Sequence, residues 1–114
     1  MLKIEYKNLY VEKLCIDEKF AQRKLPLVAA KALRLLMPIL SSCENLAFFM
    51  KPENLGYHLE KLKGKHQYEM SLRVKRGENN CGYRMIFECT NTDIKDDYIN
   101  MTAIRILDIN NHKY

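Results

Sequence analysis

The segment YEMSLRVKRGENNCGYRMIFEC, residues 68–89, has the pattern of two β-strands joined by a polar loop. Apolar side chains alternate with polar ones in its first half: Tyr68, Met70, Leu72 and Val74 against Glu69, Ser71 and Arg73. This alternation is typical of a strand with one buried face. The loop at residues 75–82 is rich in glycine and asparagine, and β-forming residues follow it at 83–89. We therefore predict an antiparallel hairpin.

A third strand is predicted at MTAIRILDI, residues 101–109, after a longer polar loop. Its nearly continuous apolar residues indicate a central strand covered on both faces. Residues 2–6, LKIEY, alternate like a short strand or extended arm. Because the predicted helices come before the run of strands, we expect an α+β fold with a helix pair on one face of an antiparallel sheet. The other face is left free for a site.

Two helices are expected between these parts. Asp17 is a good N-cap for a helix over residues 18–25, and Pro26 ends that helix and opens the next one. One apolar face is predicted for the second helix: Val28, Ala32, Leu35, Leu36 and Ile39. Pro38 lacks a backbone donor, so this helix should kink or end near Leu36–Leu40. A short turn or helical segment is expected at Asn8–Leu14.

The length and composition of the chain restrict the classes of function that it can have. The 114 residues predict a single domain, 1–114. The net charge of +5 favours polyanionic partners such as nucleic acid. The N-terminus is too charged for a secretory signal, and no stretch approaches the ~20 apolar residues of a membrane helix, so we expect a cytoplasmic protein with no membrane partner. The four cysteines are widely spaced without a C-x-x-C pair, which predicts neither a metal site nor a disulfide framework.

A basic segment, HLEKLKGKHQYEMSLRV at residues 58–74, is the first place to look for function. Lys61, Lys63 and Lys65 occupy every second position, so in an extended chain their ammonium groups project to one side. At a spacing of ~6.6 Å they can follow a phosphate backbone. The alternative is a solvated edge strand that lysines protect from pairing.

Two arginines flank the predicted hairpin loop. If the strands pair, Arg73 and Arg84 approach each other across one face, which suits bidentate contacts to phosphate. The alternative is a pair of ordinary surface arginines bound to Glu69 or Glu88.

Imidazoles near these cations point to proton transfer. His58, His66 and His112 are the histidines of the chain, and each is otherwise expected at the surface. Cleavage of RNA by its own 2′-OH needs a base, an acid and cations that offset transition-state charge, with no metal or cofactor. Lysine among other cations can also act as base or acid. Carboxylates near the segment are too few for a two-metal nuclease site.

Four blocks of this chain, KLCIDEKFAQRKLP, LEKLKGKHQYEMSLRV, YRMIFE and TAIRILDINNHKY, resemble in order and spacing the HigB toxins of the RelE superfamily, also called plasmid maintenance killer proteins. The resemblance covers about Leu14 to Lys113. It implies a RelE-like α+β domain that cleaves mRNA on translating ribosomes, in the 70S A site. It also implies a HigA-like helix-turn-helix antitoxin, which neutralises the toxin and represses the shared operon, so that operator DNA is contacted only through the antitoxin.

The resemblance and the residue analysis together predict the site. The expected catalytic residues are Lys61, Arg73, Arg84, His112 and His58. The expected RNA-binding residues are Lys63, Lys65, His66, Arg76, Asn110, Asn111 and Lys113.

The chain departs from the family pattern in two places. Many members end in D-Y-H, whereas this chain has Asn110, Asn111 and His112, and neutral amides can bind RNA but accept no proton. Many members also have a histidine at the position of Glu60, while His58 lies two residues earlier. His112 and the lysines would then share the acid and base roles.

Two other functions fit the same fold. A ParE-like toxin would act on DNA gyrase without a nuclease site, although the lysine row and Arg73 argue against it. A non-catalytic RNA-binding module is the third possibility. It lacks an evident aromatic stacking platform, because Tyr68 and Phe87 are assigned to strand packing.

Overall fold

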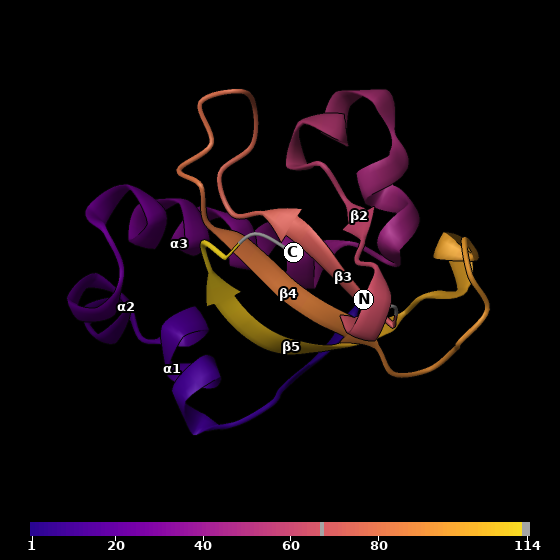
Figure 1. Cartoon of the computed structure of the whole chain (residues 1–114), viewed down its shortest axis with the longest axis horizontal. Helices are drawn as coiled ribbons and strands as arrows, with labels where there is room; N and C mark the ends of the chain where they lie inside the picture. Colours follow the sequence, from indigo (N-terminus) through magenta and orange to yellow (C-terminus); the bar gives the residue numbers. More distant parts are fainter. Residues whose placement is uncertain (67, 113–114) are drawn as a thin grey trace.

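A computed structural model describes residues 1–66 and 68–112, the side chain of Lys65 excepted. It confirms the α+β class: three α-helices precede most of a five-stranded sheet (Figure 1). The helices are α1 (Leu9–Ile16), α2 (Glu18–Lys24) and α3 (Leu27–Ser42). The strands are β1 (Lys3–Tyr6), β2 (Glu60–Lys61), β3 (Glu69–Arg73), β4 (Arg84–Cys89) and β5 (Ala103–Asn110). Short 3-10 helices are η1 (Leu46–Met50), η2 (Pro52–Tyr57), η3 (Gly64–His66) and η4 (Tyr98–Asn100).

The strands form one sheet in the order β1-β5-β4-β3-β2. The predicted hairpin is confirmed, because β3 and β4 pair antiparallel around the loop between them. The sheet is mixed rather than wholly antiparallel, since β1 pairs in parallel with β5. Parallel neighbours need a long crossover connection, and here the helices and the other strands all lie between them. β5 lies between β1 and β4, so its predicted interior place in the sheet is confirmed. The prediction that both of its faces are covered is wrong: Ile104 and Ile106 on the helix face are fully buried, whereas Arg105 and Leu107 on the other face are only partly buried, because the helices pack on one face alone.

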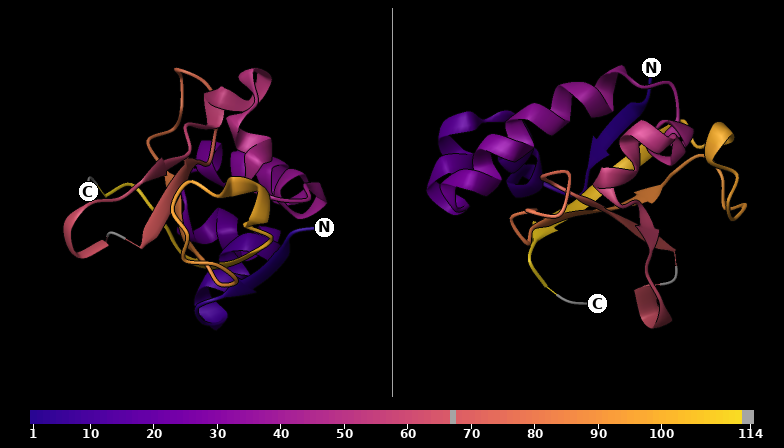
Figure 2. Two further views of the ribbon diagram at one scale, coloured as in Figure 1. Left: turned by 90° about the vertical axis from the view of Figure 1, so that its right-hand side faces the viewer. Right: turned by 90° about the horizontal axis from the view of Figure 1, so that it is seen from above.

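The helices cover one face of this sheet, and residues 111–112, which follow β5, lie on the opposite side (Figures 1 and 2). α1 contacts both α3 and β5. The core between the helix layer and the sheet includes the buried residues Leu14, Leu33, Leu36, Met85, Phe87 and Ile106. Burial of these apolar side chains is the main force that joins the two layers.

Side-chain caps start the first two helices. The side chain of Asn8 accepts a hydrogen bond from the Val11 amide, and that of Asp17 accepts one from the Phe20 amide. The predicted cap at Asp17 is therefore confirmed. The short helical segment expected from Asn8 onward is α1, so three helices rather than two precede β2.

The long helix α3 differs from its prediction in two respects. It continues past Pro38 and ends at Ser42, beyond the predicted end near Leu36–Leu40, whereas the alternative of a kink at Pro38 stays a prediction. Leu36 and Leu40 on either side of Pro38 are buried, and their packing holds the last turns against the core. Its buried face is also rotated from the predicted one: Ala29, Ala30, Ala32, Leu33, Leu36 and Leu40 are buried. Val28 and Leu35 are exposed. An almost wholly apolar helix offers several possible stripes, and packing selects one. None of the described helices is long and apolar enough to span a membrane.

The strand β3 also differs from simple alternation. Met70, Leu72 and Val74 are buried as predicted, but Tyr68 is 72% exposed. Ser71, predicted on a polar face, is fully buried. Tyr68 comes just before β3, where no neighbouring element covers it, whereas Ser71 is covered by a side chain from β4.

All four cysteines lie within the described residues, and all four are free thiols. Cys15 and Cys43 are buried, and burial raises the pKa of Cys15 to about 12. The Cys15 thiol is therefore protonated at neutral pH and unreactive, since the thiolate is the nucleophilic form.

We expect the two aromatic residues of the hairpin to contribute very differently to stability. Phe87→Ala should lower the free energy of unfolding by about 3–5 kcal/mol, because the ring is fully buried and its loss leaves a cavity. Tyr68→Ala should change it by less than about 0.5 kcal/mol. Urea unfolding followed by circular dichroism measures both. Equal effects would contradict the exposed position of Tyr68.

Candidate active site

The register of the sheet decides which polar side chains meet. Glu60 of β2 pairs with Ser71 of β3, and Arg73 pairs with Arg84 of β4. Directly opposite residues of an antiparallel pair share a face, as do residues two apart along one strand. Glu60, Ser71, Arg73 and Arg84 therefore lie on the same face, the one away from the helices. The predicted approach of the two arginines is confirmed.

A pocket of about 550 Å³ lies on this face. It is lined by residues from four parts of the chain: Glu60, Leu62, Ser71, Cys81, Gly82, Arg84, Asn111 and His112. Arg84 and His112, both predicted as catalytic, are brought together here although they lie far apart in the sequence. A carboxylate, a guanidinium and an imidazole thus line one cavity.

The guanidinium of Arg84 is held in place by backbone and side-chain oxygens. Its Nε donates to Ser71 Oγ at 2.8 Å, and its Nη2 donates to the carbonyls of His58 at 2.8 Å and Ser71 at 3.3 Å. Burial lowers the pKa of Arg84, the carboxylate of Glu60 opposes this shift, and the positive charge of Arg73 adds to it. An arginine stays charged at physiological pH despite such a shift. The fixed cation suits an anionic ligand.

The second arginine is anchored to the hairpin loop. Arg73 Nη1 donates to the Gly77 carbonyl at 3.1 Å. Gly77 has a φ of 93°, a backbone conformation that favours glycine. The loop therefore folds back on the strand and fixes Arg73 beside Arg84. Two cations on one face can contact the same phosphate group.

His58 and Glu60 form a pair at the edge of the pocket. His58 Nε2 lies 2.8 Å from Glu60 Oε2, and Glu60 Oε1 lies 3.9 Å from Arg84 Nη2. His58 has a left-handed backbone with a φ of 49°, and its carbonyl accepts the hydrogen bond from Arg84. One residue thus contacts both the carboxylate and the guanidinium.

The end of β5 brings the C-terminal residues to the pocket. Asn110, paired opposite Arg84, is buried, and its amide nitrogen donates to Asp108 Oδ2 at 2.8 Å. Its side-chain oxygen accepts from the His112 backbone amide at 3.1 Å. Asn110 therefore shapes the turn, whereas Asn111 and His112 line the cavity.

The predicted row of lysines does not form. β2 ends at Lys61, Leu62 is buried, and residues 64–66 form the 3-10 helix η3 instead of an extended chain. Lys63 is exposed, and the side chain of Lys65 lies outside the described part of the structure. Gly64 has a φ of 67°, which turns the chain and ends the alternation on which the prediction relied.

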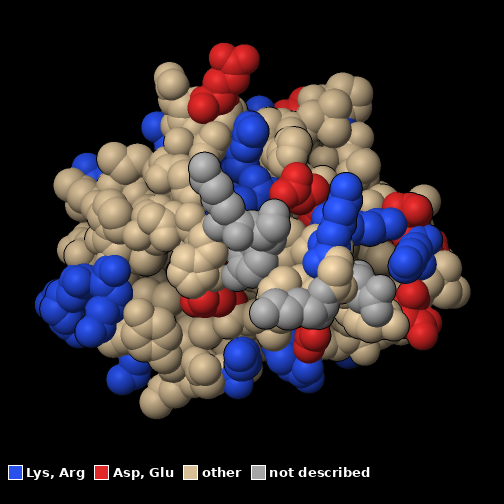
Figure 3. All heavy atoms as spheres, in the orientation of Figure 1, with Lys and Arg blue, Asp and Glu red and all other residues tan. Residues whose placement is uncertain are grey.

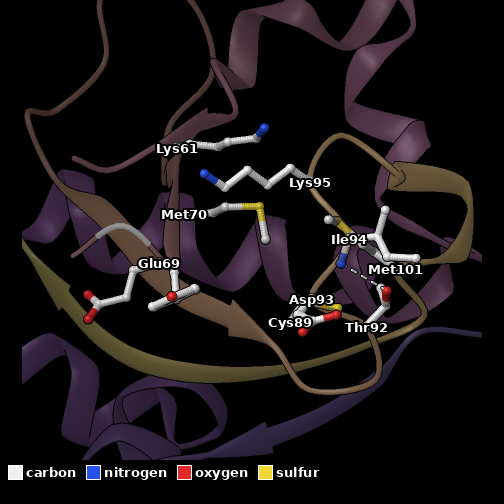
Figure 4. Close-up of a pocket in the computed structure, with 10 residues that line it drawn as sticks. Lys61, Glu69, Met70, Cys89, Thr92, Asp93, Ile94, Lys95 and Met101 are labelled. Carbon is white, nitrogen blue, oxygen red and sulfur yellow. Dashed lines mark hydrogen bonds between the residues drawn. The ribbon is translucent and has the colours of Figure 1, made fainter. Parts of the chain in front are cut away.

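Lys61 points to the opposite face from Glu60. Its ammonium group forms an ion pair with Asp96, a contact that lowers the pKa of that carboxyl. Lys61 and Lys95 contribute to a second, smaller pocket of about 100 Å³ with an apolar floor that includes Met70 and Met101 (Figure 4). The structure thus does not bring Lys61 together with Arg84 and His112. Alternation along β2 is the reason, since Glu60 already faces the site.

The other predicted RNA-binding residues have separate surroundings. His66 Nδ1 lies 3.2 Å from Glu69 Oε1, outside the pocket of Arg84. Arg76 donates to the Glu53 carbonyl at 2.8 Å and lies over the ring of Tyr57. Lys113 falls outside the described residues. Among the described residues, basic and acidic side chains are interspersed over the face drawn in Figure 3.

A comparison with protein families decides the identity of the fold. The family model described as a RelE-like toxin of the type II toxin-antitoxin system HigB matches residues 4–102. The chain belongs to this HigB-like toxin family. No curated protein matches the chain. The resemblance seen in the sequence is confirmed, and a type II toxin implies a partner antitoxin.

The family match includes part of the toxin's pocket. Glu60, Ser71 and Arg84 lie within residues 4–102, as does Arg73, which pairs with Arg84 but does not itself line the pocket, and His112 lies beyond them. No group of three or more His, Cys, Asp or Glu side chains in the described residues of the toxin is placed to hold a metal ion.

Sequence reasoning missed five residues that line the toxin's pocket: Glu60, Leu62, Ser71, Cys81 and Gly82. Glu60 carried a signal, because it lies within the basic segment at residues 58–74, directly before Lys61. Ser71 had none, since a small polar residue in an alternating strand is expected at the surface. Cys81 lies in a loop whose path is set by the pairing of β3 with β4.

We expect inorganic phosphate to bind in this pocket. Arg84→Ala should weaken its binding about 10- to 100-fold, because hydrogen bonds to a charged group contribute about 1.5–3 kcal/mol. Arg34→Ala is the matched control, since Arg34 pairs with Glu18 in the helix layer. A chemical-shift titration measures both affinities. If Lys61→Ala weakened binding as much as Arg84→Ala, the placement of Lys61 outside the pocket would be wrong.

Proposed function

We propose that this toxin is an endoribonuclease that cleaves mRNA on the ribosome through attack by the 2′-OH of the RNA. The observation that carries the proposal is the pocket in which Arg84 and His112 meet beside Arg73. A cation pair supplies the charge stabilisation and an imidazole the proton donor that this reaction requires. Membership of the HigB-like toxin family supports the same proposed function.

Each side chain has a role in the proposed reaction. Arg84 and Arg73 bind the non-bridging oxygens of the scissile phosphate and offset the charge that develops in the transition state. The hydrogen bonds from Arg84 to Ser71 and His58 hold the guanidinium before substrate arrives. Such preorganisation avoids a reorganisation step during catalysis.

His112 is the proposed acid. Its imidazole protonates the 5′ oxygen as the bond between phosphorus and that oxygen breaks, because histidine exchanges protons near neutral pH. Asn111 lines the same cavity and can donate to the RNA through its amide. The catalytic role predicted for Lys61 stays a prediction, since its ammonium group forms an ion pair with Asp96 away from the pocket.

The proposed partners follow from the same function. The mRNA is presented in the ribosomal A site in the cytoplasm, and a HigA-like helix-turn-helix antitoxin neutralises the toxin. The modest net charge of +5 suits a protein that meets RNA on a ribosome.

Inducible expression followed by primer extension on a reporter mRNA tests this function. Wild-type toxin should cut at ribosome-occupied codons. His112→Ala and Arg84→Ala should each reduce cleavage by about 10²-fold or more, since general acids and transition-state cations contribute at this scale. Arg34→Ala, which removes the same charge from the helix layer, should cleave like wild type.

The outcomes separate the three functions. An intact transcript with arrested growth would sink the nuclease proposal, and DNA-damage signalling would then indicate a ParE-like toxin acting on gyrase. Binding to ribosomal mRNA without any cut would indicate a non-catalytic RNA-binding module.

A further inference from the structure

We propose that Glu60 is the general base of this toxin and that His58 is the residue that positions it. This inference rests on the proposed RNA cleavage and assigns the proton acceptor that the cleavage requires. Glu60 was not among the residues predicted from the sequence. Its placement in the pocket, on the side of β2 opposite to Lys61, is what points to the role.

The position of Glu60 is fixed by backbone pairing. Glu60 and Ser71 are partners in the β2–β3 ladder, and Ser71 is the residue that holds Arg84 Nε. The carboxylate is therefore presented on the same face as the proposed phosphate site. Its side chain is 45% exposed, so a ribose hydroxyl can reach it from solvent.

The carboxylate has acceptor capacity left for a substrate proton. One oxygen, Oε2, lies 2.8 Å from His58 Nε2. The other, Oε1, is 3.9 Å from Arg84 Nη2, which is beyond hydrogen-bond distance. An ionised carboxylate offers about four lone-pair sites. Oε1 therefore faces the cation that binds the phosphate and can also accept a hydrogen bond from an adjacent 2′-OH.

His58 couples the base to the phosphate site. Its left-handed backbone, with a φ of 49°, lets the imidazole contact Glu60 while the carbonyl of the same residue accepts from Arg84 Nη2 at 2.8 Å. A single residue thus sets the separation of the carboxylate and the guanidinium. His58 is a positioning residue here, because its imidazole contacts Glu60 and its carbonyl contacts Arg84, while His58 itself does not line the pocket.

The proton balance of the step is complete. Glu60 takes the proton of the 2′-OH while the 2′ oxygen forms a bond to phosphorus. The bond from phosphorus to the 5′ oxygen breaks, and protonated His112 gives its proton to that oxygen. The products are a 2′,3′-cyclic phosphate and a 5′-OH end, with Glu60 protonated and His112 neutral. No further reactant is needed.

Single-turnover cleavage of ribosome-bound mRNA by the purified toxin tests the assignment. Glu60→Gln should reduce the cleavage rate by about 10²–10⁴-fold, the usual contribution of a general base, with little change in substrate binding. Glu60→His should retain part of the activity. Its ascending pH–rate limb should lie at higher pH than that of wild type, because an imidazole loses its proton at a higher pH than a carboxylic acid.

The chain offers a matched control in a second carboxylate–imidazole pair. Glu69 contacts His66 at 3.2 Å outside the pocket, so Glu69→Gln should cleave like wild type. His58→Asn should lose less than about tenfold and keep the ascending limb of wild type, since asparagine tolerates a left-handed backbone. Thermal unfolding of each variant confirms that the fold is retained.

Three results would overturn the inference. Full activity of Glu60→Gln, or a Glu60→His profile identical to wild type, would remove Glu60 from the reaction while RNA cleavage itself stands. Loss of cleavage in His58→Asn with activity retained in Glu60→Gln would make His58 the base. Absence of cleavage by wild-type toxin would refute the proposed function and this assignment together.

Discussion

The hydrogen bonds of Arg84 are the constraint on which the rest of the site depends. The guanidinium side chain is only 19% exposed, and a charge so placed is stable only when its donors are satisfied. Ser71 and the carbonyl of His58 satisfy them. Three separate segments, β4, β3 and the turn before β2, are thereby joined at one cation. The pocket is the cavity that these segments leave beside the Arg84 guanidinium.

The same arrangement distributes the basic residues of the chain over two sides of the sheet. Lys61 binds Asp96 on the side away from the pocket, and Arg105 binds Glu88 and Glu5 near the other edge. Exposed ion pairs of this kind contribute little to stability. Each of them nevertheless neutralises a lysine or arginine, so these cations do not add to the positive potential at the pocket. This leaves Arg73 and Arg84 as the cations that we propose for binding phosphate.

An irregularity in β5 brings the C-terminal residues into register with Arg84. Ile86 pairs with Asp108, whereas Phe87 pairs with Ile106, so that one extra residue is accommodated in β5. A bulge of this kind shifts all later residues by one place and commonly re-aims side chains near functional sites. Here it sets Asn110 opposite Arg84, and the side chain of Asn110 then turns the backbone at His112 toward the cavity.

The α+β class, the hairpin of β3 and β4, the cap at Asp17, the interior place of β5 and the approach of Arg73 to Arg84 were all predictable from the amino-acid sequence. These features depend on local periodicity, on capping chemistry and on the pairing of strands joined by a short loop, and residues close together in the sequence specify all three. Three features became known only from the three-dimensional fold: the parallel pairing of β1 with β5, the buried face of α3, and the position of Glu60 rather than Lys61 at the pocket. The physical reason is that a strand alternates its side chains between two faces, so the outcome depends on which partner it pairs with and in which register. A two-residue strand that ends at a turn carries too little pattern to specify that choice, and the pairing of Glu60 with Ser71 specifies it instead.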